Sequence, residues 1–97
     1  MIIHLRIEGI VQGVYYRQTA IKKALEIGGI SGWVRNRTDG SVEILAQGDD
    51  DKLSTLKDWC HIGSPASNVT AVEELLTDNI ASLPDITQGV FRKESTL

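Results

Sequence analysis

The sequence is poor in cysteine, proline and aromatic residues: its 97 residues include one Cys, two Pro, two Trp, two Tyr and one Phe. Cys60 stands alone, so no disulfide forms within the chain, and a single thiol fits a reducing compartment. No apolar run approaches the roughly 18 residues of a membrane span, and the first residues lack the pattern of a secretory signal. We therefore expect one cytoplasmic domain, residues 1–97, that folds without covalent staples.

Basic charge is also scarce. The net charge is −3, which argues against nucleic acid as a partner. The charge is unevenly divided, because residues 1–48 carry six Lys and Arg against four Asp and Glu, while residues 49–97 carry four against nine. A small anion would more plausibly bind to residues 1–48. Chance partitioning of surface charge explains the same numbers equally well.

Local patterns divide the chain into strands and helices. Alternating apolar residues predict strands, and apolar residues at three- and four-residue steps, Leu25 among them, predict a first helix that Gly28-Gly29 ends. Asp39-Gly40 is typical of a hairpin turn. The carboxylates of Asp49–Asp51 suit the positive end of a second helix and can cap its free amides. The predicted elements are strands Ile2–Glu8, Ile30–Arg37, Ser41–Gln47 and Asn68–Leu76, helices Tyr16–Ile27 and Asp49–Ile62, a loop Asp78–Gln88 and a short final strand within Gly89–Lys93.

The order of these elements is β-α-β-β-α-β. It predicts an α+β domain of the ferredoxin-like split βαβ type, with two helices packed on one face of a four- to five-stranded, mainly antiparallel sheet. Right-handed crossovers place the first strand between the third and the fourth. Many unrelated activities share this architecture, so the fold leaves the function open.

The segment between the first strand and the first helix carries the chemistry. It reads Gly-Ile-Val-Gln-Gly-Val-Tyr-Tyr-Arg from Gly9 to Arg17. A glycine-bearing loop that enters a helix can turn backbone N–H groups towards an anion, and Gly13 has no Cβ to block a phosphate. The planar guanidinium of Arg17 can hold two phosphate oxygens. The loop matches neither a Walker nor a dinucleotide motif, and an ordinary loop followed by a surface arginine is the alternative.

This segment resembles the acylphosphatase signature Gly-x-Val-Gln-Gly-Val-x-aromatic-Arg at every specified position. The residues from Gly32 to Val42, with Gly48 beyond them, resemble the second signature of that family. Gly63-Ser64-Pro65-Ala66 is similar to the turn that follows the second helix in such proteins. The likeness spans most of the chain and fades beyond about residue 77.

The resemblance implies a hydrolase that cleaves the carboxyl–phosphate bond of small acyl phosphates without metal or cofactor. Main-chain N–H groups would hold the phosphoryl group, Arg17 would anchor it, and the side-chain amide of Asn36 would orient the attacking water. The phosphate-binding loop would consist of Gln12, Gly13, Val14, Tyr15, Tyr16 and Arg17. We also expect a monomer whose partner is a small molecule rather than nucleic acid or a membrane.

The spacing departs from the family pattern at one place. Arg17 and Asn36 are separated by one residue more than the pattern implies, and the excess lies at Glu26–Gly29. We expect the helix-to-strand turn to absorb it as a bulge. Otherwise Asn36 would face the opposite side of its strand, because side chains alternate along a strand.

Other reactive residue types have simpler interpretations. We expect His4 and His61 to be solvated, Cys60 to be a small core residue, and Arg35 and Arg37 to be exposed on the strand face opposite Asn36. Packing explains Trp33 and Trp59 better than ligand stacking does. A metal site at Asp49–Asp51 is less plausible than helix capping.

Two other function classes remain. One is a catalytically silent anion- or protein-binding module, because ferredoxin-like domains often serve as binding platforms and an acylphosphatase-like domain also occurs within larger carbamoyl-transfer maturation enzymes. The Arg17/Asn36 pair favours an enzyme, and the length of the chain argues against a fragment of a maturation enzyme. The other is a reader of RNA, which would need exposed aromatics where the first strand has His4, Arg6 and Glu8.

Overall fold

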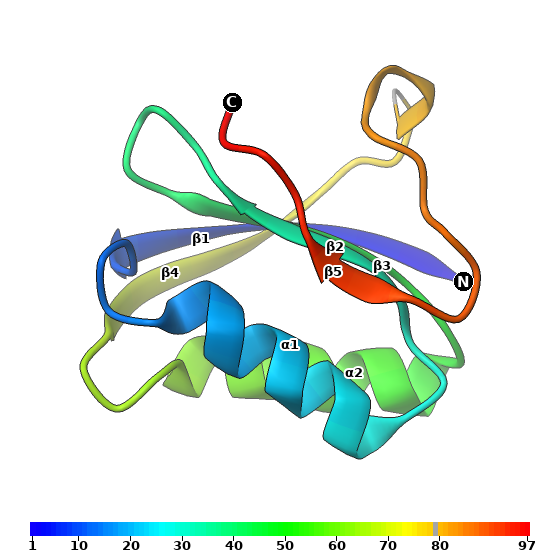
Figure 1. Ribbon diagram of the computed structural model, residues 1–97, viewed down its shortest axis with the longest axis horizontal. Coiled ribbons are helices and arrows are strands. Elements are labelled where there is room, and N and C mark those ends of the chain that lie inside the picture. The colour runs from blue at the N-terminus through cyan, green and yellow to red at the C-terminus, as the bar shows by residue number, and fades with distance from the viewer. Residues whose placement is uncertain (79) are drawn as a thin grey trace.

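A five-stranded sheet with two α-helices on one face forms the body of the molecule in the computed structural model, which describes residues 1–78 and 80–97 (Figure 1). The elements in chain order are β1 (Ile2–Ile10), α1 (Tyr16–Ile27), β2 (Ser31–Asn36), β3 (Val42–Gln47), α2 (Asp50–Ile62), β4 (Asn68–Leu75), the 3-10 turn η1 (Ile80–Ser82) and β5 (Phe91–Lys93). The strand order is β4-β1-β3-β2-β5, so β1 lies between β3 and β4 as predicted. Neighbouring strands are antiparallel except β5, which runs parallel to β2. The predicted ferredoxin-like α+β fold is confirmed.

The apolar core lies between the helices and the sheet. Alternate residues of β1 enter it, and α1 and α2 each supply one stripe. The members contributed by these three elements are Ile3, Leu5, Ile7, Tyr16, Ala20, Ala24, Leu53, Leu56, Trp59 and Cys60. Cys60 is fully buried, as expected for a small core residue. Leu25 does not join the stripe: one residue beyond Ala24 it is turned about 100° round the helix, and 68% of its surface is exposed.

The observed elements differ from the predicted ones by one residue at the ends of β2, β3 and β4, and in three further respects. β1 continues to Ile10 through a bulge after Glu8, because β4 keeps pairing with it as far as Asn68. Asp49 occupies the N-cap of α2, yet its side chain makes no capping hydrogen bond, so the predicted cap is wrong. The predicted loop Asp78–Gln88 contains η1, and Asn79 lies outside the described residues. None of the described helices is both long enough and apolar enough to cross a membrane.

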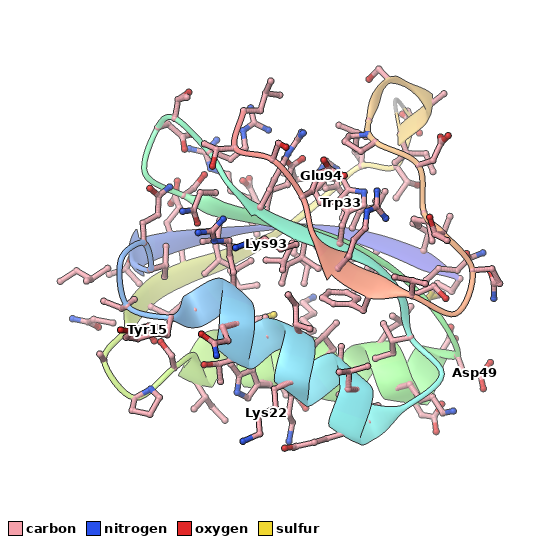
Figure 2. The ribbon with its side chains drawn as sticks, in the orientation of Figure 1. Tyr15, Lys22, Trp33, Asp49, Lys93 and Glu94 are labelled. Atoms are coloured by element: carbon pink, nitrogen blue, oxygen red, sulfur yellow. The ribbon has the colours of Figure 1, made fainter. Side chains whose placement is uncertain are left out.

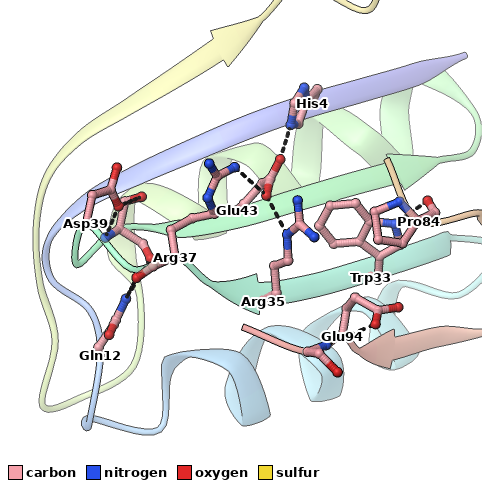
Figure 3. Close-up of polar contacts among 11 residues, drawn as sticks. His4, Gln12, Trp33, Arg35, Arg37, Asp39, Glu43, Pro84 and Glu94 are labelled. Atoms are coloured by element: carbon pink, nitrogen blue, oxygen red, sulfur yellow. Dashed lines mark hydrogen bonds and ion pairs between the residues drawn. The ribbon is translucent and has the colours of Figure 1, made fainter. Parts of the chain in front are cut away.

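The sheet face opposite the helices holds a buried charged group. Glu43 lies on β3, the middle strand of the sheet, and is only 2% exposed. Its carboxylate contacts His4 Nε2 at 2.6 Å, Arg35 Nε at 2.6 Å and Arg37 Nη1 at 3.0 Å (Figure 3). We call these four residues the Glu43 cluster. The expectations of a solvated His4 and an exposed Arg35 are therefore wrong.

A distant segment covers part of this face, over Trp33. Trp33 Nε1 donates to the carbonyl of Pro84 at 2.9 Å, so the segment before β5 lies over β2 (Figure 3). The Arg35 guanidinium lies 4.8 Å from the centre of the Trp33 ring. Trp33 and Trp59 are both buried, which agrees with their predicted packing roles. Alternation along a strand predicted which side these residues face, but it carries no information about what covers that side.

Candidate active site

The loop between β1 and α1 has an unusual backbone conformation. Gly13 adopts φ 73°, and Tyr15, the N-cap of α1, adopts φ 62° and ψ 22°. Left-handed residues are uncommon for side chains other than glycine, and successive residues of opposite hand form concave sets of N–H groups. Tyr15 is the sole non-glycine residue with positive φ in the part of the chain that the structure describes. The loop is therefore shaped by its surroundings rather than by local preference.

Hydrogen bonds to the carbonyls of the loop fix the orientation of its peptide groups. Ser64 Oγ donates to the Val14 carbonyl at 2.7 Å, and Thr19 donates to the Tyr15 carbonyl from its N–H at 3.1 Å and from Oγ1 at 2.8 Å. In a trans peptide the C=O and N–H point in opposite directions. The N–H groups of Tyr15 and Tyr16 therefore point away from Ser64 and from the helix body. For the backbone N–H groups of residues 12–18, no acceptor is recorded among the described residues.

The side chain of Gln12 ties the loop to the hairpin between β2 and β3. Its Nε2 donates to the carbonyls of Arg37 at 2.7 Å and Ser41 at 2.8 Å (Figure 3). These two carbonyls flank the hairpin turn, where Asp39 Oδ1 accepts from the N–H and hydroxyl of Ser41. Gln12 thus holds the loop beside the end of β2, the strand that ends at Asn36.

A cavity of about 520 Å³ opens beside this loop and brings the predicted residues together. Arg17 and Asn36 both line it, with Gly13, Tyr15 and Tyr16 of the loop. Gln12 and Val14 are not among the lining residues. The complete lining is Val11, Gly13, Tyr15, Tyr16, Arg17, Gln18, Ile21, Asn36 and Lys93. Sequence reasoning missed Lys93, which comes from β5 at the far end of the chain.

The turn at Glu26–Gly29, where we expected an extra residue, lies outside the residues that line the cavity. Gly28 and Gly29 adopt φ 77° and 70°, which lets the chain turn out of α1 before β2 begins. The pairing of β2 with β3 then runs without a shift from Ser31 opposite Gln47 to Asn36 opposite Val42. Asn36 consequently faces the cavity. Its Oδ1 is buried and has no hydrogen-bond partner among the residues described.

The remaining reactive groups lie away from the cavity or are held neutral. Burial raises the pKa of the Cys60 thiol to about 12, and burial together with Cys60 raises the pKa of the Tyr16 hydroxyl. That hydroxyl donates to the Cys60 carbonyl at 2.9 Å, and the Tyr16 ring packs 5.1 Å from that of Trp59. His4 belongs to the Glu43 cluster and His61 is exposed. Among the described residues, no group of three or more His, Cys, Asp or Glu side chains is arranged to hold a metal ion.

A model of the acylphosphatase family matches residues 3–85, a range that contains the loop, Arg17 and Asn36. The chain belongs to the acylphosphatase family. It is 53% identical over 70 residues to the acylphosphatase of Acidovorax sp. (strain JS42), an alignment that covers 72% of this chain and 71% of that protein.

Solved structures of acylphosphatases agree with this assignment. The crystal structure of acylphosphatase from Bacillus subtilis matches with a TM-score of 0.81 at 30% identity, covering 97% of this chain and 99% of that one. An acylphosphatase from Coxiella burnetii matches with a TM-score of 0.76 at 35% identity, covering 96% and 90% of the two chains. Lys93 lies beyond the residues that the acylphosphatase model matches.

Proposed function

We propose that this protein hydrolyses the carboxyl–phosphate bond of small acyl phosphates, giving a carboxylate and inorganic phosphate. One observation supports this above the others: Arg17, Asn36 and the unpaired N–H groups of the loop meet at one cavity in a member of the acylphosphatase family. The proposal requires no metal and no cofactor. It treats residues 1–97 as one domain that acts as a cytoplasmic monomer.

The phosphoryl group would bind at the start of α1. Backbone N–H groups of Gln12 to Tyr16 would donate to its oxygens, aided by the positive end of the helix. Arg17 forms no ion pair with any described carboxylate, so its guanidinium is available for charge-assisted bonds to two phosphate oxygens. The preorganised donors stabilise charge on these oxygens as the bond to phosphorus breaks.

Asn36 would orient the water. Its unpartnered Oδ1 is a ready acceptor for a water O–H, and the water oxygen would then form a bond to phosphorus. The bond between phosphorus and the carboxyl oxygen breaks, and its electron pair leaves with the carboxylate. The proton of the water passes to a phosphate oxygen. A carboxylate is a good leaving group, so positioning and charge stabilisation suffice without a general acid.

The test is hydrolysis of benzoyl phosphate in the presence of EDTA. Loss of one preorganised polar group typically costs about 10²–10³ in rate, so Asn36→Ala and Arg17→Ala should each fall at least that far below the wild type. Arg17→Ala should also lose inhibition by inorganic phosphate, whereas Asn36→Ala should keep it. Thermal melting of each variant checks that the fold survives.

The outcome that contradicts the proposal is a wild type that binds inorganic phosphate but does not turn over benzoyl phosphate. Such a result would favour the silent anion-binding module. Activity that disappears with EDTA and returns with a divalent cation would instead overturn the metal-free chemistry. Size-exclusion chromatography with light scattering tests the proposed monomer.

A further inference from the structure

Lys93 comes to the cavity from the edge of the sheet. It pairs with Val34 in the parallel register of β5 and β2, and Val34 is fully buried on the helix side of the sheet. Asn36 lies two residues beyond Val34 and therefore faces the same side. Lys93 and Asn36 are thus diagonal neighbours on one face, and both line the cavity. Figure 2 shows Lys93 above α1, on the side of the molecule where Tyr15 marks the loop.

The cavity holds positive charge that the described part of the protein does not neutralise. Neither Arg17 nor Lys93 pairs with a described carboxylate, and no Asp or Glu is among the lining residues. The carboxylate next to Lys93 in the sequence is already engaged, because Glu94 Oε2 accepts from Arg92 Nη2 at 2.9 Å. An anionic ligand with more than one charged group would suit this arrangement.

A phosphoryl group alone leaves Lys93 without a role. The loop N–H groups and Arg17 supply the donors that a phosphoryl group needs. The cavity of about 520 Å³ lies within the range of about 300–1,000 Å³ that is typical of pockets for larger organic ligands, so it has room for an acyl part as well. That acyl part would extend from the phosphoryl site towards the edge of the sheet, where Lys93 is exposed.

We propose that Lys93 makes the enzyme selective for acyl phosphates whose acyl part carries a second anionic group. This inference rests on the proposed function. The ammonium would attract the second anion as a point charge, without fixed geometry. The competing explanation is that Lys93 protects the exposed edge strand β5 from pairing with other chains, as edge lysines do.

The test compares succinyl phosphate with butyryl phosphate, which have similar chains but differ by one carboxylate. Each variant is described by its ratio of kcat/KM for the two substrates. Lys93→Met should lower the ratio by about two- to fivefold, the effect of an ion pair at a partly exposed site, and Lys93→Arg should restore it. Lys22→Met is the matched control: Lys22 is exposed on α1 and does not line the cavity (Figure 2), so its removal changes the net charge alone.

A ratio that is the same in Lys93→Met and Lys22→Met overturns the inference and favours the edge-protection role. A wild type that hydrolyses neither substrate overturns the proposed function instead. Binding then decides the inference without turnover: 3-phosphonopropionate should bind the wild type more tightly than propylphosphonate does, and Lys93→Met should remove that preference. Equal binding of the two phosphonates by the wild type contradicts the inference.

Discussion

The Glu43 cluster and the cavity lie on opposite sides of the sheet, and they differ in whether their charged side chains are paired. In the Glu43 cluster, one buried carboxylate accepts from three basic side chains, each within 3.0 Å. At the cavity, Arg17 and Lys93 have no described carboxylate partner, and the neighbouring N–H groups have no described acceptor.

The difference reflects burial. A charge removed from water must be paired, and Arg35 and Glu43 are almost completely buried. Arg17 and Lys93 remain in contact with solvent, so the fold tolerates them unpaired. The Glu43 cluster therefore supports the structure, whereas the cavity cations are available to a ligand. The stability, pH dependence and salt dependence of the Glu43→Gln variant and of phosphate inhibition test this division.

The largest effect should come from Glu43→Gln. The variant leaves the buried Arg35 guanidinium without its counter-charge, and breaking a buried pair in this way costs about 3–5 kcal/mol. Urea unfolding at pH 7 measures the loss, and inhibition of the folded protein by inorganic phosphate should not change. A stable variant that has lost phosphate binding would contradict the division, because the cluster would then support the cavity.

The pH dependence of the same variant gives a second check. Burial raises the pKa of Glu43, but donation by Arg35, His4 and Arg37 outweighs it, so the pKa falls below its ordinary value of 4.5. A carboxylate with a lowered folded pKa stabilises the protein above its unfolded pKa, and this contribution is lost as the pH falls through the folded pKa. The gap in unfolding free energy between wild type and Glu43→Gln should therefore close as the pH drops below about 4.5.

The sequence predicted the parts of the site that depend on local order. The loop and Arg17 stood out because glycines that precede a helix are a signal encoded within a few residues. Asn36 was named only through the resemblance of Gly32–Val42 to the second signature of the family. Asn36 lines the cavity, and β2 pairs with β3 without a shift up to that residue.

Contacts between distant segments explain what the sequence did not predict. The Trp33 ring is covered by the chain around Pro84, 51 residues further along the sequence, and the buried Arg35 guanidinium lies over that ring. Lys93 reaches the cavity only because β5 pairs in parallel with β2. Neither the cover over Trp33 nor the pairing of β5 with β2 produces a periodic pattern of apolar residues in the sequence. The hydrogen bond from Ser64 Oγ to the Val14 carbonyl was not predicted either, because the sequence of the turn Gly63–Ala66 carries no information about a partner fifty residues earlier.

A smaller effect should separate Ser64 from Ser67. Ser64→Ala leaves the part-buried Val14 carbonyl without its donor, and loss of a hydrogen bond of this kind costs about 1 kcal/mol. It also frees the peptide whose N–H we assign to phosphate, so inhibition by inorganic phosphate should weaken. Ser67→Ala is the matched control, since Ser67 Oγ donates at 2.7 Å to the Ser64 carbonyl rather than to a loop carbonyl. Equal phosphate inhibition in both variants would show that Ser64 stabilises the turn without orienting the loop.

The smallest effect should come from salt. The Debye length falls from about 10 Å at 0.1 M to about 3 Å at 1 M, and exposed charges are screened far more than buried ones. Raising sodium chloride over this range should weaken phosphate inhibition several-fold, because Arg17 and Lys93 are open to solvent. The gap in unfolding free energy between wild type and Glu43→Gln should stay constant, because Glu43 and Arg35 are shielded from ions. If inhibition by inorganic phosphate does not change with the sodium chloride concentration, the backbone N–H groups, rather than Arg17, dominate phosphate binding.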